Sequence, residues 1–231
     1  MDRVLLFDID GTLLEPARGR GYRREIKIVL EEIFGTYGRL DEVSFGGKTD
    51  LAILREALEP AGISGDMIRE RLGRWETGLL DLTERLCRES PLFVRCPGAG
   101  ELLEALANDE AYTLSLLTGN LESMATAKLA VVGLDHHFRV RGAYGSDHED
   151  RNELPAIAAG RISAHVGRSY EPADFVIVGD TPRDIAAARH FGMRCIAVAT
   201  GGFSLDALAA HRPDALLPDL CDVEAVLRVL S

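Results

Sequence analysis

The chain has 231 residues, of which 46% are hydrophobic and 27% charged, a composition typical of a soluble globular protein. Its formal net charge of −11 argues against a nucleic-acid-binding surface, which needs an excess of Lys and Arg. The apolar runs fall short of the roughly 20 residues that a membrane span needs. We expect no signal peptide, because a strand pattern begins almost at the first residue. The four cysteines show no metal-binding spacing, which favours reduced thiols and a cytoplasmic location.

The first predicted element is a strand over residues 4–7 that runs directly into the sequence DIDGT at residues 8–12. Successive strand residues point to opposite faces, so we expect Asp8 and Asp10 to project together while Ile9 turns toward the core. Ligands of open α/β sheets bind just beyond the carboxyl ends of the strands. An acidic turn without a function is the plain alternative. The segment is therefore a candidate active site.

A long region without strands follows. After a connector rich in Gly and Arg, apolar residues recur with helical spacing and predict helices over residues 26–34, 51–58, 65–72 and 75–87. A glycine-rich loop at residues 45–50 precedes the second of these helices, with Thr49 or Asp50 as its N-cap. We find no convincing strand between residues 15 and 90, and we predict an all-helical insertion there.

Strands and helices alternate again from residue 97. The strands are expected over residues 112–117, 138–143, 175–178, 194–199 and 215–217. Helices between such strands imply parallel βαβ units with right-handed crossovers. We therefore predict the α/β class, with a Rossmann-like three-layer core built on a parallel sheet (residues 1–14 and 91–231) and an inserted all-helical cap domain (residues 15–90).

Three of the predicted strands end in polar side chains: Asp8 and Asp10, Thr118 and Asn120, Asp180 and Asp184. If the strands are parallel, all these side chains emerge at the same edge of the sheet. Carboxylates that converge without a cation raise one another's pKa, whereas Mg²⁺ binds a few carboxylate oxygens and keeps positions for water and phosphate. The hydroxyl of Thr118 and the N-terminus of the helix that follows favour an anion. The pattern indicates a Mg²⁺-dependent phosphate site.

The same residues supply the parts of a phosphoryl-transfer reaction. Asp8 is placed to attack phosphorus and form an aspartyl phosphate, and Asp10 to protonate the leaving oxygen and later activate water. The charge on the transferring group also needs a cation. Arg151, in the loop before the predicted helix at residue 153, is the candidate. Lys128 is its rival, although we expect it to be exposed in the middle of a helix.

These motifs resemble those of a known family. Residues 8–12, 118–120 and 179–184 are similar to the first, second and fourth motifs of the haloacid dehalogenase superfamily. The helical insertion resembles that superfamily's C1 cap, and residues 46–50 resemble its cap loop. The resemblance covers nearly the whole chain, and it is greatest to phosphoglycolate-phosphatase-like hydrolases.

The resemblance implies a role for each aspartate of the three motifs. Asp8 would be the nucleophile and Asp10 the general acid and base. Asp8, the main-chain oxygen of Asp10, and Asp180 would bind Mg²⁺, and Asp184 would support the metal site from behind.

The resemblance also implies how the phosphoryl group is held. Thr118 would bind it, with help from Gly119 and Asn120. The third motif of the family usually has a lysine followed by proline, whereas the matching segment here reads EDRNE at residues 149–153. Because arginine keeps the charge and grips phosphate with two donors, we transfer the role of the lysine to Arg151.

Other candidates carry less weight. Lys48 in the cap loop is a candidate for substrate binding, or for the imine-forming lysine of a phosphonate hydrolase. The alternative is that Lys48 is simply an exposed residue at the start of a helix. The arginines of the connector are candidates for guiding an anionic substrate, although a solvated connector is the better interpretation: Arg18, Arg20, Arg23 and Arg24. We assign no role to the histidines at 136, 137 and 148, and we place Trp75 and Phe45 in the core of the cap.

The predicted activity is Mg²⁺-dependent hydrolysis of a small phosphorylated metabolite, either phosphoglycolate-like or a sugar phosphate. Closure of the cap would exclude water during the first half of the reaction. One alternative is a phosphosugar mutase of the β-phosphoglucomutase type, and another is a catalytically silent protein that binds phosphometabolites. A dehalogenase is disfavoured, because dehalogenation needs neither Asp10 nor the metal cluster. We expect no nucleic-acid or membrane partner.

Overall fold

The computed structural model describes residues 3–17 and 23–230. Its core is a five-stranded sheet in the order β4-β1-β5-β6-β7, and every neighbouring pair is parallel. The strands are β1 (Arg3–Phe7), β4 (Tyr112–Leu116), β5 (Phe175–Gly179), β6 (Arg194–Val198) and β7 (Ala215–Leu217). The predicted parallel α/β core is confirmed.

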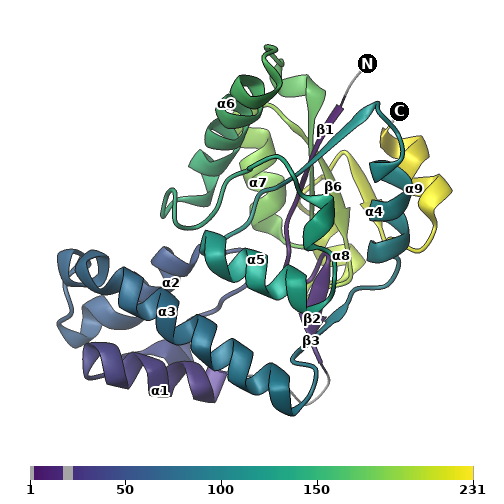
Figure 1. Ribbon diagram of the computed structural model, residues 1–231. Helices are drawn as coiled ribbons and strands as arrows, with labels where there is room; N and C mark the ends of the chain where they lie inside the picture. Colours follow the sequence, from purple (N-terminus) through teal and green to yellow (C-terminus); the bar gives the residue numbers. More distant parts are fainter. Residues whose placement is uncertain (1–2, 18–22, 231) are drawn as a thin grey trace.

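Helices cover both faces of this sheet (Figure 1). Leu5 and Phe7 of β1 pack in one cluster with α4 (Ala99–Ala107), α5 (Glu122–Val131) and α9 (Val223–Leu230). Val4 and Leu6 pack in the other cluster with α6 (Leu154–Val166), α7 (Pro182–Phe191) and α8 (Leu205–Ala209). Because alternate residues of a strand face opposite sides and both sides are buried, the strand is continuously apolar.

The strand register brings the motif loops to one level. Phe7, the last residue of β1, pairs with Leu116 of β4 on one side and with Val178 of β5 on the other. The chain therefore leaves the three strands side by side, at the carboxyl edge of the sheet. Asp8, Thr118 and Asp180 follow at this edge.

A second lobe of helices lies at this edge (Figure 1). It contains α1 (Arg23–Phe34), α2 (Asp50–Leu58) and α3 (Gly65–Glu89), which surround their own apolar core. Two short strands, β2 (Leu14–Pro16) and β3 (Phe93–Arg95), lead into and out of the lobe and pair antiparallel. We call this lobe the cap, and we keep the division into a core and a cap at residues 15–90 as a proposal.

The sequence-based elements differ from the structure in several places. The helices predicted over residues 65–72 and 75–87 form the single helix α3. A glycine weakens a helix without breaking it, and Gly73 faces open space. The strand predicted over residues 138–143 is wrong, because Ala143 makes only an isolated bridge to Leu117. The Ser115 hydroxyl donates to the carbonyl of Val140 at 2.8 Å, whereas in a strand a backbone amide would donate to it. The short strand β2 was also not expected.

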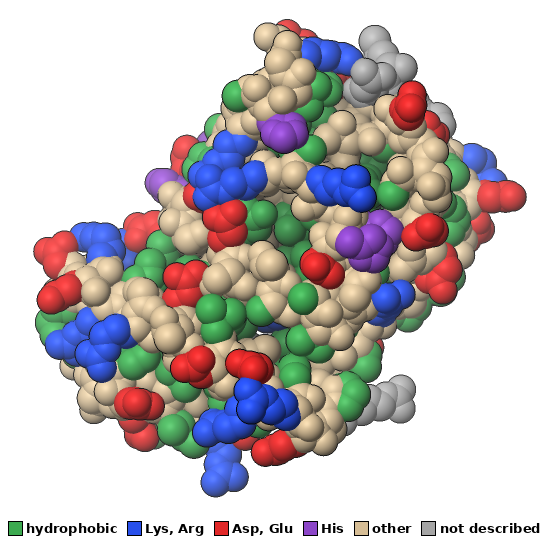
Figure 2. Space-filling model, in the orientation of Figure 1, with side chains coloured by type: hydrophobic (Ala, Val, Ile, Leu, Met, Phe, Trp, Pro, Cys, Tyr) green, Lys and Arg blue, Asp and Glu red, His purple; other side chains and the backbone are tan. Residues whose placement is uncertain are grey.

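The surface seen from one side carries charges of both signs. On the face shown in Figure 2, acidic and basic side chains are interspersed over both lobes. Within residues 3–17 and 23–230, no helix combines the length and apolarity that crossing a membrane requires.

Candidate active site

Three buried carboxylates meet at the edge of the sheet. Asp8, Asp180 and Asp184 are at most 4% exposed, and they present oxygens that all lie within 4.8 Å of one another. The Asp8 amide donates to the carbonyl of Val178 at 2.9 Å, which anchors the start of the loop. Gly11 follows with a φ of +86°, and a Cβ there would lie 2.3 Å from an oxygen of Asp180. The turn therefore requires glycine, and it brings the backbone up against the carboxylates.

The carboxylates are electrostatically crowded. Burial raises the pKa of Asp8 to about 6, against the opposing charge of Arg151. Burial also raises the pKa of Asp180 to about 8, and the charges of Asp184 and Asp8 add to this effect. A divalent cation would relieve this repulsion, and clustered carboxylate oxygens are the donor type that Mg²⁺ prefers. The residues present therefore fit a hard metal ion.

Arg151 lies inside this cluster. The guanidinium is 6% exposed; its Nη2 is 3.1 Å from Asp8 and also pairs with Asp184. Although burial lowers the pKa of Arg151, the carboxylates of Asp184 and Asp8 hold it above its usual value. The buried Nε has no hydrogen-bond partner within the described part of the chain. The cation expected from the third-motif segment thus sits beside the candidate nucleophile, with one donor to spare.

The segment after β4 lies across from these carboxylates. Thr118 is fully buried, and its hydroxyl oxygen accepts from the amide and the side chain of Asn120, at 3.3 and 2.8 Å. The side chain of Asn120 also donates to Asp10 at 2.7 Å. A Cβ on Gly119 would lie 2.1 Å from the carbonyl oxygen of Lys48. The cap loop therefore touches the backbone of the second motif.

Lys128 is not exposed, and our expectation for it was wrong. It is 7% exposed, and its Nζ lies 2.8 Å from both carboxylate oxygens of Asp10 and 2.6 Å from Asn120. The reason is that α5 packs against α3 of the cap, so that its inner face is covered. Lys128 lies seven residues after buried Leu121, and this spacing places both on one face of a helix. The spacing could therefore have indicated that Lys128 is buried.

The cap loop is bound to the core at several points. Thr49 caps α2 by accepting from the amide of Ala52 at 3.1 Å, as predicted, and its hydroxyl donates to the carbonyl of Glu149 at 2.6 Å. The amide of Asp50 donates to the carbonyl of Gly119 at 2.8 Å. The Asp50 carboxylate accepts from the amide of Leu121, also at 2.8 Å. Asp50, which the sequence suggested only as a cap, thus joins the two lobes beside the site.

Lys48 and the connector arginines are placed differently from the catalytic candidates. Lys48 lines the cavity described below, but its ammonium pairs with Glu56. Arg23 is half-buried: both of its terminal nitrogens donate to the carbonyl of Val43 at 3.1 Å, and its guanidinium lies over the Phe45 ring at 4.0 Å. Arg24 is exposed. Arg18 and Arg20 lie outside the described residues.

A cavity of about 370 Å³ connects these groups, a size typical of small-molecule sites. Its floor contains the catalytic candidates: Asp8, Asp10, Thr118, Arg151 and Asp180. Its roof comes from the cap. Trp75, which is buried, and Phe45, which is half-buried, both line it. The cavity places a ligand between the strand edge and the cap helices.

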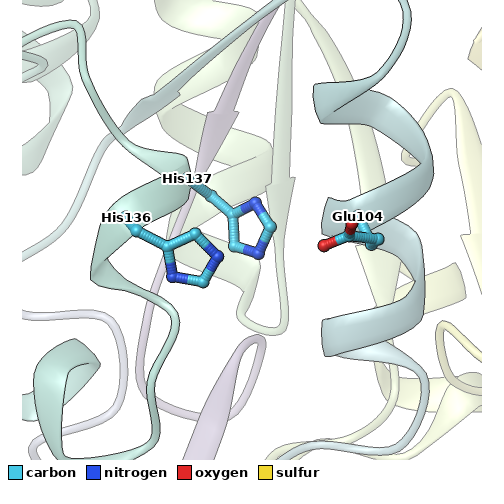
Figure 3. A group of neighbouring side chains, drawn as sticks. All are labelled: Glu104, His136 and His137. Atoms are coloured by element: carbon cyan, nitrogen blue, oxygen red, sulfur yellow. The ribbon is translucent and has the colours of Figure 1, made fainter.

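A second group of possible metal ligands lies on the surface (Figure 3). Glu104 projects from α4 toward His136 and His137, and their ligand atoms lie within 4.8 Å of one another. Burial and the neighbouring His136 lower the pKa of His137. This group could not be recognised from the sequence, because Glu104 is distant in the chain from His136 and His137. None of its members lines the cavity, and we assign it no role in the reaction.

Comparison with known proteins adds to this geometry. The family model described as HAD-hydrolase-like matches residues 153–223. The chain is 27% identical to "Probable phosphatase IndB" of Dickeya dadantii, over 100% of this chain and 95% of the relative. It is 29% identical to a phosphoglycolate phosphatase of Synechococcus elongatus, over 99% of both chains.

Solved structures share the fold. The crystal structure of CbbY from Rhodobacter sphaeroides in complex with phosphate superposes with a TM-score of 0.67 at 19% identity, over 96% of both chains. A likeness at this identity speaks for the architecture alone. The matched family model and the full-length relatives show that the chain is similar to haloacid dehalogenase-like hydrolases, and that phosphoglycolate phosphatases are among those relatives.

Proposed function

We propose that this hydrolase cleaves a small phosphate monoester in a Mg²⁺-dependent reaction that passes through an aspartyl phosphate on Asp8. Its family and its phosphatase relatives support the general activity, hydrolysis of phosphate monoesters. One observation carries the finer proposal. The buried carboxylates of Asp8, Asp180 and Asp184 meet at the strand edge, beside a buried arginine and at the floor of a cavity.

The metal would be held by the carboxylates of Asp8 and Asp180 and by the main-chain oxygen of Asp10, with Asp184 behind them. Bound there, Mg²⁺ supplies positive charge that offsets the carboxylates and the phosphoryl oxygens. Arg151 already neutralises part of this charge, because it contacts both Asp8 and Asp184. Its position beside Asp8 supports its transfer into the role of the missing lysine.

Asp8 would act as the nucleophile. One of its carboxylate oxygens attacks phosphorus, the bond from phosphorus to the leaving oxygen breaks, and an aspartyl phosphate forms. Thr118 supports the transferring group: its oxygen accepts from Asn120, which leaves its O–H to donate to a phosphoryl oxygen. The unpartnered Nε–H of Arg151 is a second donor. Preorganised donors of this kind stabilise the charge of the transition state.

Asp10 would move the protons. In the first step it donates a proton to the leaving oxygen, and in the second it takes a proton from the water that attacks the aspartyl phosphate. This second attack releases inorganic phosphate and restores Asp8. Lys128 and Asn120 fix the Asp10 carboxylate in place through the contacts described above.

Phosphate release from small phosphomonoesters tests the proposal. We expect release with Mg²⁺, little release with a chelator, and a fall of about 10³-fold or more in kcat for Asp8→Asn. The matched control is Asp206→Asn, on the exposed surface of α8, which should retain full activity. Circular dichroism shows whether each variant folds.

Two results would contradict this assignment. Asp8→Asn that is folded and still active would exclude Asp8 as the nucleophile, and full activity in chelator would exclude the metal requirement. A quenched-flow experiment that finds labelled phosphate on the protein would support the aspartyl phosphate directly. Isomerisation of a sugar phosphate without net release would instead support the phosphosugar mutase.

A further inference from the structure

We propose that the cap side of the cavity binds an apolar leaving group, so that the preferred substrate is the phosphate monoester of an apolar alcohol. Phosphoglycolate and sugar phosphates would then be poor substrates. The inference rests on the proposed phosphatase function, because it assumes that the phosphoryl group binds at Asp8. It names the chemical class of the group on the other side of the scissile bond.

The roof of the cavity is built from apolar side chains. Each of the cap helices contributes two of them: Ile26 and Leu30 from α1, Ile53 and Leu54 from α2, Trp75 and Leu79 from α3. The core adds the aromatic rings of Phe93 and Phe203 to the walls. A ligand group that extends from the strand edge toward the cap therefore meets hydrocarbon and aromatic surface.

The cations on the cap side of the cavity already have partners. Arg23 donates to the carbonyls of Leu40 and Val43 and lies over the ring of Phe45. Lys48 pairs with Glu56. Both contacts turn the positive charge toward the cap itself. Among the cap residues that the structure describes, these are the two basic side chains that line the cavity.

The charged groups between the cap and the floor of the cavity also have partners within the protein or carry a negative charge. The ammonium of Lys128 is held by Asp10 and Asn120. Asp50, a carboxylate that lines the same cavity, would repel an anionic substituent. Burying a carboxylate or a hydroxyl without a partner is unfavourable, and apolar pockets gain from each added methylene. An alkyl or aryl group suits these walls, whereas the carboxylate of phosphoglycolate would find the cap-side cations already paired within the protein.

A series of n-alkyl phosphates tests this inference. Ethyl, butyl and hexyl phosphate have leaving groups of similar intrinsic reactivity and differ in apolar length. With Mg²⁺ present, we expect kcat/KM to rise about 10- to 100-fold from ethyl to hexyl phosphate, and hexyl phosphate to exceed 2-phosphoglycolate by at least about tenfold.

A matched pair of variants on α1 locates the effect. Ile26 lines the cavity, whereas Ile28 on the same helix is 54% exposed and does not. Ile26→Thr should reduce the ratio of kcat/KM between hexyl and ethyl phosphate several-fold. Ile28→Thr should leave that ratio unchanged. Ile28→Thr controls for the same substitution on the same helix, and circular dichroism with thermal unfolding shows whether Ile26→Thr keeps the fold.

The outcomes separate the substrate class from the activity. A flat alkyl series, or faster hydrolysis of 2-phosphoglycolate, with release that is lost in Asp8→Asn, would overturn the apolar subsite and leave the phosphatase intact. A rising series that both variants preserve would place the apolar contact elsewhere and overturn this assignment. No release from any ester by the folded protein would overturn the phosphatase, and the subsite with it.

Discussion

Asp10 is held by neighbours that do not touch the reacting phosphorus in the proposed mechanism. Its carboxylate receives two contacts of 2.8 Å from Lys128 and one of 2.7 Å from Asn120. A general acid works only when it is aligned with the leaving oxygen, so small misplacements are costly. We therefore propose that Lys128 is a positioning residue for Asp10.

Replacement of Lys128 tests this role. Lys128→Met keeps the apolar stem and removes the ammonium, and we expect kcat to fall about 10- to 100-fold with little change in KM. The fall in kcat at constant KM separates this role from a purely structural one. Lys27→Met, on the surface of the cap where Lys27 pairs with Asp41, is the control. An unchanged kcat in Lys128→Met would show that Asp10 needs no such support.

The site residues that could be predicted from the sequence differ from the others in what determines their position. Asp8, Thr118 and Asp180 follow directly after apolar strands, and the strand register alone brings them together. Lys128 and Asp50 act across the boundary between the lobes. Their burial depends on how α5 and α2 dock, which no local pattern in the chain specifies. Sequence reasoning therefore found the side chains at the strand ends and Arg151, but it expected Lys128 to be exposed and took Asp50 only for a helix cap.

At the scale of elements, the cap loop and the second motif are packed backbone against backbone. The amide of Asp50 donates to the carbonyl of Gly119, and Gly119 leaves no room for a side chain beside Lys48. A methyl group at this position would push the loop off the core. The glycine thus controls how closely the cap approaches the phosphate site.

Gly119→Ala is the direct test of this close approach. We expect a loss of about 1–3 kcal/mol in the free energy of unfolding, as for other overpacked sites, and a fall in kcat/KM of about tenfold or more because the cap loop is displaced. Gly160→Ala is the control. Gly160 lies inside α6 with nothing near its Cβ position, so alanine should stabilise the protein by up to about 1 kcal/mol. Wild-type activity and stability in Gly119→Ala would contradict the steric argument.

The elements themselves were predictable where one physical signal dominated. Parallel strands buried on both faces are continuously apolar, and β1 and β5 were found within a residue or two. The prediction of an element failed where the local sequence pattern and the tertiary packing favour different structures. Gly73 lies between the two predicted helices, but α3 continues through it, with buried Ile68 before it and buried Trp75 after it. The segment at residues 138–143 has the composition of a strand, but only Ala143 pairs with the end of β4 through its backbone, and the carbonyl of Val140 accepts from the Ser115 hydroxyl instead.

At the scale of the whole molecule, the buried carboxylates couple stability to pH. The pKa of Asp8 rises from 3.8 to about 6, and that of Asp180 from 3.8 to about 8. A carboxyl whose pKa is raised by folding binds its proton more tightly in the folded state. Its contribution to stability is therefore complete below pH 3.8 and is lost as the pH rises through the folded-state pKa. Without metal, these two groups favour folding less at pH 8 than at pH 5.

Mg²⁺ should reverse this trend, because it binds the ionised carboxylates and competes with protons for them. We expect the increase in Tm that Mg²⁺ produces over a chelator to grow from pH 5 to pH 8. Differential scanning calorimetry at four or five pH values measures it. In Asp180→Asn the increase should be smaller and less dependent on pH. A Mg²⁺ effect of constant size across this range would show that these carboxyls do not take up protons in the metal-free protein.

The paired strands β2 and β3 have a consequence for how such a protein can change over generations. The amide of Ala17 donates to the carbonyl of Leu92 at 3.0 Å, so the chain departs from the core and returns to it at almost the same point. The segment between these residues is encoded by one continuous stretch of gene. A different inserted segment could therefore replace it and join the core at the same two points. In the proposed mechanism, selection can thus alter what the cap recognises while the aspartates at the strand ends are inherited unchanged.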